Sequence, residues 1–249
     1  MITGKEIVKT YGNKAEKSNA LNRVSLTIEE GEFVAVMGPS GCGKSTLLFS
    51  LSGTDHIDGG SVRLGDRELS NLKENELSDL RRRKMGFVFQ QPTMLKNLNL
   101  LDNIILPAAQ DHRKDMSGVT ARARELMRQT GIEDLAARDI TEVSGGQLQR
   151  AGICRALINS PDILFADEPT GALNSKVADE IMELFEEINH KGTAIMLVTH
   201  DAKVAAKAKR VLFMKDGEIV QELAISEYAD RSVQEKMEMV SMKMRDMEI

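Results

Sequence analysis

The chain has 249 residues, of which 41% are hydrophobic and 29% are charged, and its formal net charge is −5. This balance is typical of a soluble globular protein, and the negative charge argues against a nucleic-acid partner held by phosphate contacts. No apolar run approaches the roughly 18 residues of a membrane span, and the N-terminus lacks a signal-peptide core. Two cysteines are too few for a disulfide framework, so we expect a reducing cytosol. Any membrane role must therefore come through a partner.

Strand-like segments predict an α/β fold. Residues 24–28, in the N-terminal part up to about residue 64, alternate between apolar and polar side chains, which predicts a small antiparallel sheet. Three later runs, Phe33–Met37, 163–166 and Ala194–Val198, are apolar throughout, as in strands buried on both faces of a parallel sheet. Polar residues follow each run, so we expect them at the carboxyl edge of one sheet, where open α/β folds bind ligands. That edge would hold Lys44, Asp167, Glu168 and His200.

Helix-like segments lie between these runs. One starts at Lys44 and ends near Gly53, and another covers 176–190 with its apolar side chains on one face. Residues 92–161 contain no comparable strand runs, whereas 120–130 and 147–158 look helical, so we predict a helical subdomain inserted into the core. We expect one domain, with a core of about 1–91 and 160–225, a helical subdomain of about 92–159 and a C-terminal helix of about 226–249.

The predicted C-terminal helix carries a regular apolar pattern. Its members follow the four-three spacing of a packed helix seam. Met at this spacing usually packs rather than binding a soft metal such as Cu(I). The seam comprises Val233, Met237, Val240, Met244 and Met247.

A glycine-rich loop follows the first buried run. It matches the GxxxxGK[ST] pattern, in which glycines let backbone N–H groups surround phosphates without Cβ clashes. Lys44 would reach the β- and γ-phosphates, and the Ser45 hydroxyl would ligate Mg²⁺. We interpret Cys42 as a small residue that fits the turn rather than as a reactive thiol. The predicted phosphate site comprises Gly38, Pro39, Ser40, Gly41, Cys42, Gly43, Lys44, Ser45 and Thr46.

Two acidic residues close the second buried run. Asp167 is predicted as a carboxylate associated with Mg²⁺. Glu168 comes next and is suited to orient and deprotonate an attacking water. A capping or salt-bridging role is the alternative for Glu168 taken alone. Its position beside Asp167, together with His200, favours catalysis.

The sequence Ser-Gly-Gly-Gln at 144–147 lies downstream of the phosphate loop. By itself it is typical of a helix start capped by serine. Together with the preceding motifs it resembles the signature of ATP-binding subunits of ABC transporters, and the resemblance covers nearly the whole chain. The resemblance implies an α/β fold: a RecA-like P-loop NTPase core with an N-terminal antiparallel β-subdomain and an inserted helical subdomain. It also implies ATP as cofactor, faced from a second copy of the chain by Ser144, Gly145, Gly146 and Gln147.

Three further residues match motifs of that family in order. Tyr11 resembles the aromatic residue that stacks on adenine, and Gln90 resembles the glutamine that contacts Mg²⁺ and the attacking water. His200 resembles the histidine that contacts the γ-phosphate. The resemblance therefore implies that the catalytic residues are Glu168, His200 and Gln90, and that the Mg²⁺ site comprises Ser45, Gln90 and Asp167.

Two positions depart from the family pattern. Val143 stands where the family usually has Leu before the signature, which is a mild apolar exchange. Asn174 stands where the D-loop usually ends in Asp, and it keeps a carbonyl acceptor but loses the charge. We expect Asn174 to alter the coupling between two ATP sites without abolishing ATP binding.

An apolar stretch at 91–107 follows Gln90. In the family this region lines the groove that receives a coupling helix of a membrane permease, and packing within the helical subdomain is the alternative. We expect Met94, Leu95 and Leu98 to include partner contacts. The chain would then lie on the cytoplasmic face of a bacterial cell membrane, held there by the permease.

Segments 87–91 and 166–175 are similar to one branch of the family, which includes bacitracin-type antimicrobial-peptide resistance, macrolide-export and lipoprotein-release ATPases. We expect ATP-driven closure of a homodimer to power a separate permease for antimicrobial-peptide resistance or export. A regulatory or mechanotransmitting ABC ATPase, as in lipoprotein release or cell division, is one alternative. The other is a soluble ABC ATPase that acts on nucleic acid or ribosomes. Such proteins usually have two cassettes or a long coiled-coil insertion, and this chain has neither.

Overall fold

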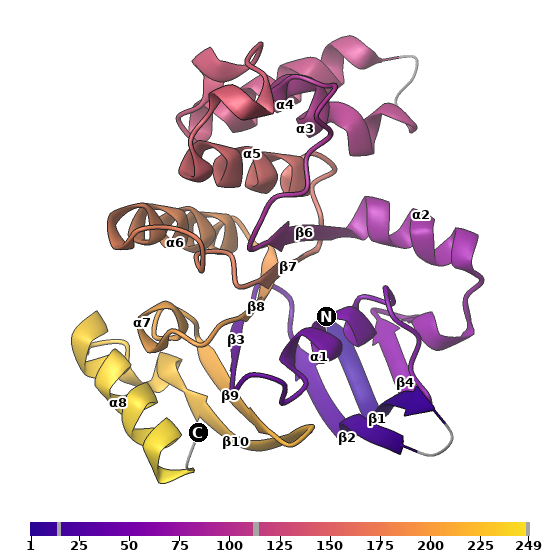
Figure 1. Ribbon diagram of the computed structural model, residues 1–249, viewed down its shortest axis with the longest axis vertical. Helices are drawn as coiled ribbons and strands as arrows, with labels where there is room; N and C mark the ends of the chain where they lie inside the picture. Colours follow the sequence, from indigo (N-terminus) through magenta and orange to yellow (C-terminus); the bar gives the residue numbers. More distant parts are fainter. Residues whose placement is uncertain (14–15, 112–114, 248–249) are drawn as a thin grey trace.

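The computed structural model describes residues 1–13, 16–111 and 115–247, and a six-stranded sheet runs through its centre (Figure 1). The strand order is β10-β9-β3-β8-β7-β6, in which β10 pairs antiparallel to β9 and all other neighbours are parallel. The strands are β3 (Phe33–Met37), β6 (Met85–Phe89), β7 (Ile163–Asp167), β8 (Ala194–Val198), β9 (Arg210–Lys215) and β10 (Glu218–Ala224).

A second sheet is antiparallel and comes from the N-terminal part of the chain. Its order is β2-β1-β4-β5, and Ile2 of the first strand pairs with Ile28 on one side and with Leu64 on the other. This sheet confirms the one predicted from the alternating segment. Its strands are β1 (Ile2–Asn13), β2 (Glu16–Ile28), β4 (Gly59–Leu64) and β5 (Arg67–Glu68).

Helices lie on both sides of the central sheet. Figure 1 shows α3, α4 and α5 gathered at one end of the molecule, α1 beside the antiparallel sheet, and α7 and α8 next to β9 and β10. The α-helices are α1 (Lys44–Leu51), α2 (Glu74–Lys84), α3 (Leu100–Ala109), α4 (Met116–Gln129), α5 (Gly145–Leu157), α6 (Ser175–His190), α7 (Ala202–Ala205) and α8 (Val233–Asp246). Short 3-10 turns lie at Leu69–Asn71, Glu133–Leu135, Ile140–Glu142 and Ile225–Tyr228.

The central strands supply two hydrophobic cores. In β3, Phe33, Ala35 and Met37 belong to one core, and Val34 and Val36 belong to the other. The first core also contains buried residues of α3 to α8, and the second contains those of β1, β2, α1 and α2. Because successive side chains of a strand point to opposite faces, a strand buried on both faces must be apolar throughout. This explains the continuous apolar runs and confirms their prediction as buried parallel strands.

The predicted helices are confirmed, with differences at their ends. The helix predicted over 120–130 begins earlier, at Met116, because the Asp115 carboxylate caps it by accepting a hydrogen bond from the Gly118 N–H at 3.1 Å. The amphipathic α6 buries Ile181 and Phe185 on the predicted face. Among the described residues, α3, α4 and α5 fill the predicted helical subdomain, and its sequence boundaries stay predictions.

The patterns in the sequence do not predict α2, β6 or α3. In α2, only Leu77 and Leu80 are buried, so its apolar pattern is weak. The apolar run of β6 is interrupted by Gly86, where an added Cβ would lie 2.6 Å from the Ala156 carbonyl oxygen of α5. The glycine therefore lets α5 approach the sheet closely, and it hides the strand pattern at the same time.

The predicted seam of the C-terminal helix is partly wrong. Val240 is fully buried, and Met244 and Met247 pack against the first core. Val233 is 45% exposed, and Met239, outside the predicted seam, packs in addition. Because Val240, Met244 and Met247 all lie in the second half of α8, only the later part of the four-three pattern faces the core.

Candidate nucleotide-binding site

Four neighbouring strands bring the predicted site residues to one edge of the central sheet. The strands β3, β8, β7 and β6 are adjacent in that order and parallel. Lys44, His200, Glu168 and Gln90 each follow the carboxyl end of one of them. Because parallel strands present their carboxyl ends at the same edge, residues far apart in the sequence converge there.

The phosphate loop has the backbone geometry that its glycines allow. Gly43 has a φ of +106°, and an added Cβ would lie 2.3 Å from the Ala20 carbonyl oxygen of β2. The Lys44 ammonium is buried and donates hydrogen bonds to the carbonyl oxygens of Gly38 and Pro39, both at 2.9 Å. Among the described residues, no side chain caps α1, so the N–H groups of its first turn point to the loop and can bind phosphate.

Ser45 and Asp167 supply two hard oxygen atoms next to this loop. The Ser45 hydroxyl donates a hydrogen bond to Oδ1 of Asp167 at 3.0 Å. Burial raises the pKa of Asp167, and the hydrogen bond from Ser45 opposes that rise. Mg²⁺ is usually bound in phosphate sites by one or two such protein oxygens, with phosphates and waters completing its shell. This pair of oxygens therefore fits the predicted metal.

Glu168 is held in an uncommon backbone conformation. Its φ is +48°, its N–H donates to the Val198 carbonyl at 2.9 Å, and its carbonyl accepts from the Gly171 N–H at 3.0 Å. Its Oε1 lies 2.9 Å from Nδ1 of His200. His200 is 72% exposed at the side chain and Glu168 only 21%. The structure thus brings the two predicted catalytic residues into contact.

Gln90 lies against the loop that follows Glu168. A Cβ added to Gly171 would lie 2.8 Å from Nε2 of Gln90. The side chain of Gln90 therefore packs on this backbone, close to the strand ends that carry Asp167 and Glu168.

The signature residues begin α5 and are held by a capping box. The Ser144 hydroxyl accepts a hydrogen bond from the Gln147 N–H at 3.3 Å, and Gln147 Oε1 accepts one from the Ser144 N–H at 2.8 Å. An added Cβ on Gly146 would lie 2.6 Å from Cγ1 of Val177 in α6. Figure 1 shows α5 and α1 on opposite sides of β6. The signature and the phosphate loop of one chain are therefore apart.

Tyr11 and Asn174 occupy the two remaining motif positions. Tyr11 lies on β1, is 47% exposed and donates its hydroxyl hydrogen to the Asp55 carboxylate. Asn174 caps α6, and its Oδ1 accepts a hydrogen bond from the Val177 N–H at 3.1 Å. An aspartate could make the same cap, so the departure at Asn174 leaves the local geometry intact.

Gln149 is a buried polar residue that the sequence analysis missed. It is 1% exposed, and its Nε2 donates to the Phe89 carbonyl at 3.0 Å and to the Pro169 carbonyl at 2.8 Å. It therefore ties α5 to the residues next to Gln90 and Glu168. Its position could have indicated a buried role, because it lies four residues before the buried Ile153 and so on the same inward face of α5.

The expected partner-contact residues differ in exposure. Leu95 is 49% exposed and Leu98 is half-buried, but Met94 is only 8% exposed and its sulfur lies 3.4 Å from Arg155. Met94 therefore packs within the helical region, and Leu95 is the exposed member of the three.

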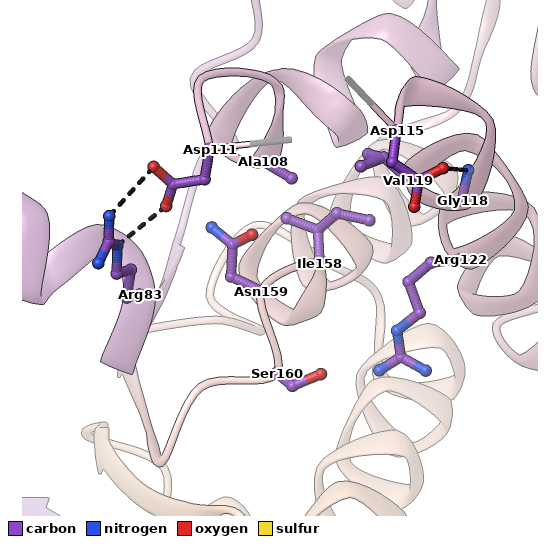
Figure 2. A pocket seen from close by; sticks show the side chains of 10 residues that line it. All are labelled: Arg83, Ala108, Asp111, Asp115, Gly118, Val119, Arg122, Ile158, Asn159 and Ser160. Atoms are coloured by element: carbon purple, nitrogen blue, oxygen red, sulfur yellow. Dashed lines mark hydrogen bonds and ion pairs between the residues drawn. The ribbon is translucent and has the colours of Figure 1, made fainter. Parts of the chain in front are cut away.

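A cavity of about 640 Å³ lies away from these residues, where the ends of α2, α3 and α5 meet the start of α4. In Figure 2, the Arg83 guanidinium points at the Asp111 carboxylate, and Nε lies 3.0 Å from Oδ2. The described residues that line this cavity all lie outside the predicted nucleotide site. Among the described helices, none is both long and apolar enough to cross a membrane.

Comparison with known proteins identifies the family. The ABC transporter family profile matches residues 21–171. The uncharacterized ABC transporter ATP-binding protein MJ0796 of Methanocaldococcus jannaschii is 42% identical over 235 residues, which cover 93% of this chain and 100% of that protein. The bacitracin export ATP-binding protein BceA of Halalkalibacterium halodurans is 39% identical over 224 residues, which cover 90% of this chain and 88% of BceA.

A match to part of a larger protein and a match to a solved structure indicate the same family. The macrolide export ATP-binding/permease protein MacB of Mannheimia succiniciproducens is 39% identical over 222 residues, but the match covers only 34% of MacB. A dimeric structure of the ATP-binding cassette MJ0796, bound to ADP and Pi in a post-hydrolysis state, has a TM-score of 0.84 and 41% identity and covers 90% of this chain and 99% of that one. The predicted fold class is thereby confirmed. The chain belongs to the ABC transporter family, in which it is an ATP-binding and ATP-hydrolysing subunit.

Proposed function

We propose that two copies of this chain bind ATP at a shared interface, with the phosphate loop of one copy facing the signature of the other. The separation of these two motifs within one chain carries the proposal, since the capped start of α5 would otherwise have no phosphate to bind. The relative MJ0796 forms a dimer in its solved structures, which supports the same arrangement. ATP must then bind the closed pair more tightly than the separated chains.

In this proposal, the residues at the carboxyl edge hold the nucleotide and Mg²⁺. Lys44 would exchange its two carbonyl partners for phosphate oxygens, and Ser45, Asp167 and Gln90 would hold the metal through their side-chain oxygens. Bound Mg²⁺ would neutralise phosphate charge that develops during hydrolysis. Tyr11 presents its exposed ring to the adenine base.

Glu168 is the proposed general base. Its Oε1 pairs with His200, so Oε2 is the oxygen that takes a proton from the attacking water. His200 holds the carboxylate and contacts the γ-phosphate, and Gln90 orients the water. The fixed backbone of Glu168 keeps the carboxylate in place without further rearrangement.

In this proposal, ATP binding and hydrolysis by the dimer power a separate membrane permease that exports peptide antibiotics. The name of BceA, which refers to export of the peptide bacitracin, supports this substrate class. The name of MacB, which refers to macrolide export, supports antibiotic export more generally. The chain would then lie on the cytoplasmic face of the membrane through its partner. Deletion of the chain in its host should raise sensitivity to bacitracin-type peptides, and wild type but not Lys44→Ala should restore resistance. Unchanged sensitivity would overturn the antibiotic assignment while leaving the ATPase assignment intact.

The exposed side chain of Leu95 offers a test of the permease contact. Leu95→Glu should reduce co-purification of the permease from membranes at least severalfold, because a charge would enter an apolar interface without a partner. Met242→Glu is the matched control, since Met242 is 57% exposed on α8. Equal recovery of the permease with both variants would contradict the contact.

A further inference from the structure

A buried lysine lies two residues before Tyr11 on β1. Lys9 is only 8% exposed. Its Nζ donates hydrogen bonds to Oδ1 of Asp55 and to the His56 carbonyl oxygen, both at 2.6 Å. A buried ammonium needs a carboxylate partner to offset its desolvation, and Asp55 is that partner. Neither residue is among the site residues predicted from the sequence.

The same carboxylate also holds Tyr11. Asp55 accepts the Tyr11 hydroxyl hydrogen bond through Oδ2, so its two oxygens bind two different residues of β1. The Lys9 ammonium lies 5.1 Å from the centre of the Tyr11 ring, within the range of a cation–π contact. The ring is thus fixed at its hydroxyl and on one face.

This arrangement leaves the opposite face of the ring for a base. Tyr11 is 47% exposed although its hydroxyl and one face are in contact with protein. Aromatic stacking depends on ring position, and an unfixed tyrosine loses rotamer freedom when a base binds. Burial raises the pKa of Asp55, but its hydrogen bonds with Lys9 and Tyr11 outweigh this and leave that pKa below its ordinary value. The carboxylate is therefore ionised at neutral pH and holds both partners.

We propose that Asp55 and Lys9 are positioning residues that fix the Tyr11 ring for the nucleotide base, and so set the preference of the site for ATP over phosphate chains without a base. The inference rests on the proposed stacking role of Tyr11. Asp55 does not touch the nucleotide in this scheme; it acts through the tyrosine hydroxyl and through Lys9.

The test compares two ligands that share phosphates and differ in the base. Dissociation constants of the full chain for ATP and for inorganic tripolyphosphate, both with Mg²⁺, are measured by calorimetry. Asp55→Asn should weaken ATP binding about threefold to tenfold and leave tripolyphosphate binding unchanged, since it weakens the hold on the ring but not the phosphate loop. Asp66→Asn, an exposed residue between β4 and β5 with the same charge change, should alter neither constant.

Tyr11→Phe keeps the ring and removes the hydroxyl, so it tests the same link if Asp55→Asn fails to fold. It should weaken ATP binding in the same direction, and the Tyr11→Phe/Asp55→Asn double variant should lose less than the product of the two single effects. Equal weakening of ATP and tripolyphosphate, or no change in either, would overturn the proposal.

A third variant separates this inference from the function on which it rests. Tyr11→Ala should lower the ratio of ATP to tripolyphosphate affinity more than Asp55→Asn does. If Tyr11→Ala leaves that ratio unchanged, the stacking role itself is wrong. If Tyr11→Ala changes the ratio and neither Asp55→Asn nor Tyr11→Phe does, stacking stands and the positioning role of Asp55 and Lys9 is wrong.

Discussion

Glu168 shows how the chain places one reactive group. A residue other than glycine with a φ of +48° costs about 1–2 kcal/mol relative to an ordinary conformation. Hydrogen bonds of its backbone to Val198 and Gly171 hold it there, and its carboxylate meets His200. Residues in such conformations cluster at functional sites. The strained backbone therefore agrees with the proposed role of Glu168 as general base.

Asn174 is a second case at the level of one residue, because its side chain has an amide nitrogen where the usual aspartate has a carboxylate oxygen. Asn174→Asp keeps the cap of α6, so we expect unchanged folding stability and ATP affinity. The added charge lies at the end of the D-loop, so the ATPase rate or its cooperativity should change. Steady-state ATPase measurements with and without the permease check this. An ATPase profile of Asn174→Asp that equals that of wild type, both with and without the permease, would count against a coupling role for this position.

At the scale of elements, Gln149 joins α5 to two loops of the core. Gln149→Leu keeps the volume but leaves the Phe89 and Pro169 carbonyls without their donor, at a cost of about 1–3 kcal/mol of stability. We expect kcat to fall, because the two carbonyls belong to residues next to Gln90 and Glu168. We expect the Kd for ATP to change little, because the phosphate loop and Tyr11 lie on other elements. Calorimetry, ATPase rates and ATP titration measure the three quantities. Gln129→Leu, on the exposed face of α4, is the control, and equal behaviour of the two variants would refute the link.

The end of α2 is joined by ion pairs to Asp111, two residues after α3. Arg82 and then Arg83 lower the pKa of Asp111 from its ordinary 3.8 to about 2. A carboxyl group whose pKa is lower in the folded state stabilises that state above its unfolded pKa, and this contribution is lost as the pH falls through the folded value. Asp111→Asn should therefore lower Tm at pH 7, and its Tm difference from wild type should shrink as the pH falls from about 4 to about 2. A difference independent of pH would contradict the ion-pair origin, and Asp66→Asn serves as the exposed control.

An element can be predicted from the sequence when consecutive residues carry its pattern, and it is missed when it depends on residues far away in the chain. The buried strands β3, β7 and β8 are visible because each is a continuous apolar run. The phosphate loop is visible because it matches a fixed motif within nine consecutive residues. The strand β6 is hidden by Gly86, which is required by the close approach of α5. The bridge made by Gln149 is also hidden, because its partners are backbone carbonyls 60 and 20 residues away in the chain.

For the whole molecule, the fold gives a reason for the proposal that each chain carries half of two sites. The central sheet gathers Lys44, Glu168, His200 and Gln90 at one edge, whereas Ser144 lies at the start of α5 in the helical region. The family resemblance predicts the pairing of two chains, but periodicity and composition do not, since an interface between copies leaves no regular pattern in the sequence.

The most direct measurement of the shared site is the mass of the Glu168→Gln chain in solution with saturating ATP and Mg²⁺. This substitution removes the proposed base and should slow hydrolysis by roughly 10²–10⁴-fold, so that bound ATP persists. Light scattering during gel filtration should then give twice the 27.5 kDa of one chain. Adding Ser144→Arg to Glu168→Gln should restore the monomer although the phosphate loop is intact. A 27.5 kDa species for Glu168→Gln with ATP bound would contradict the shared site.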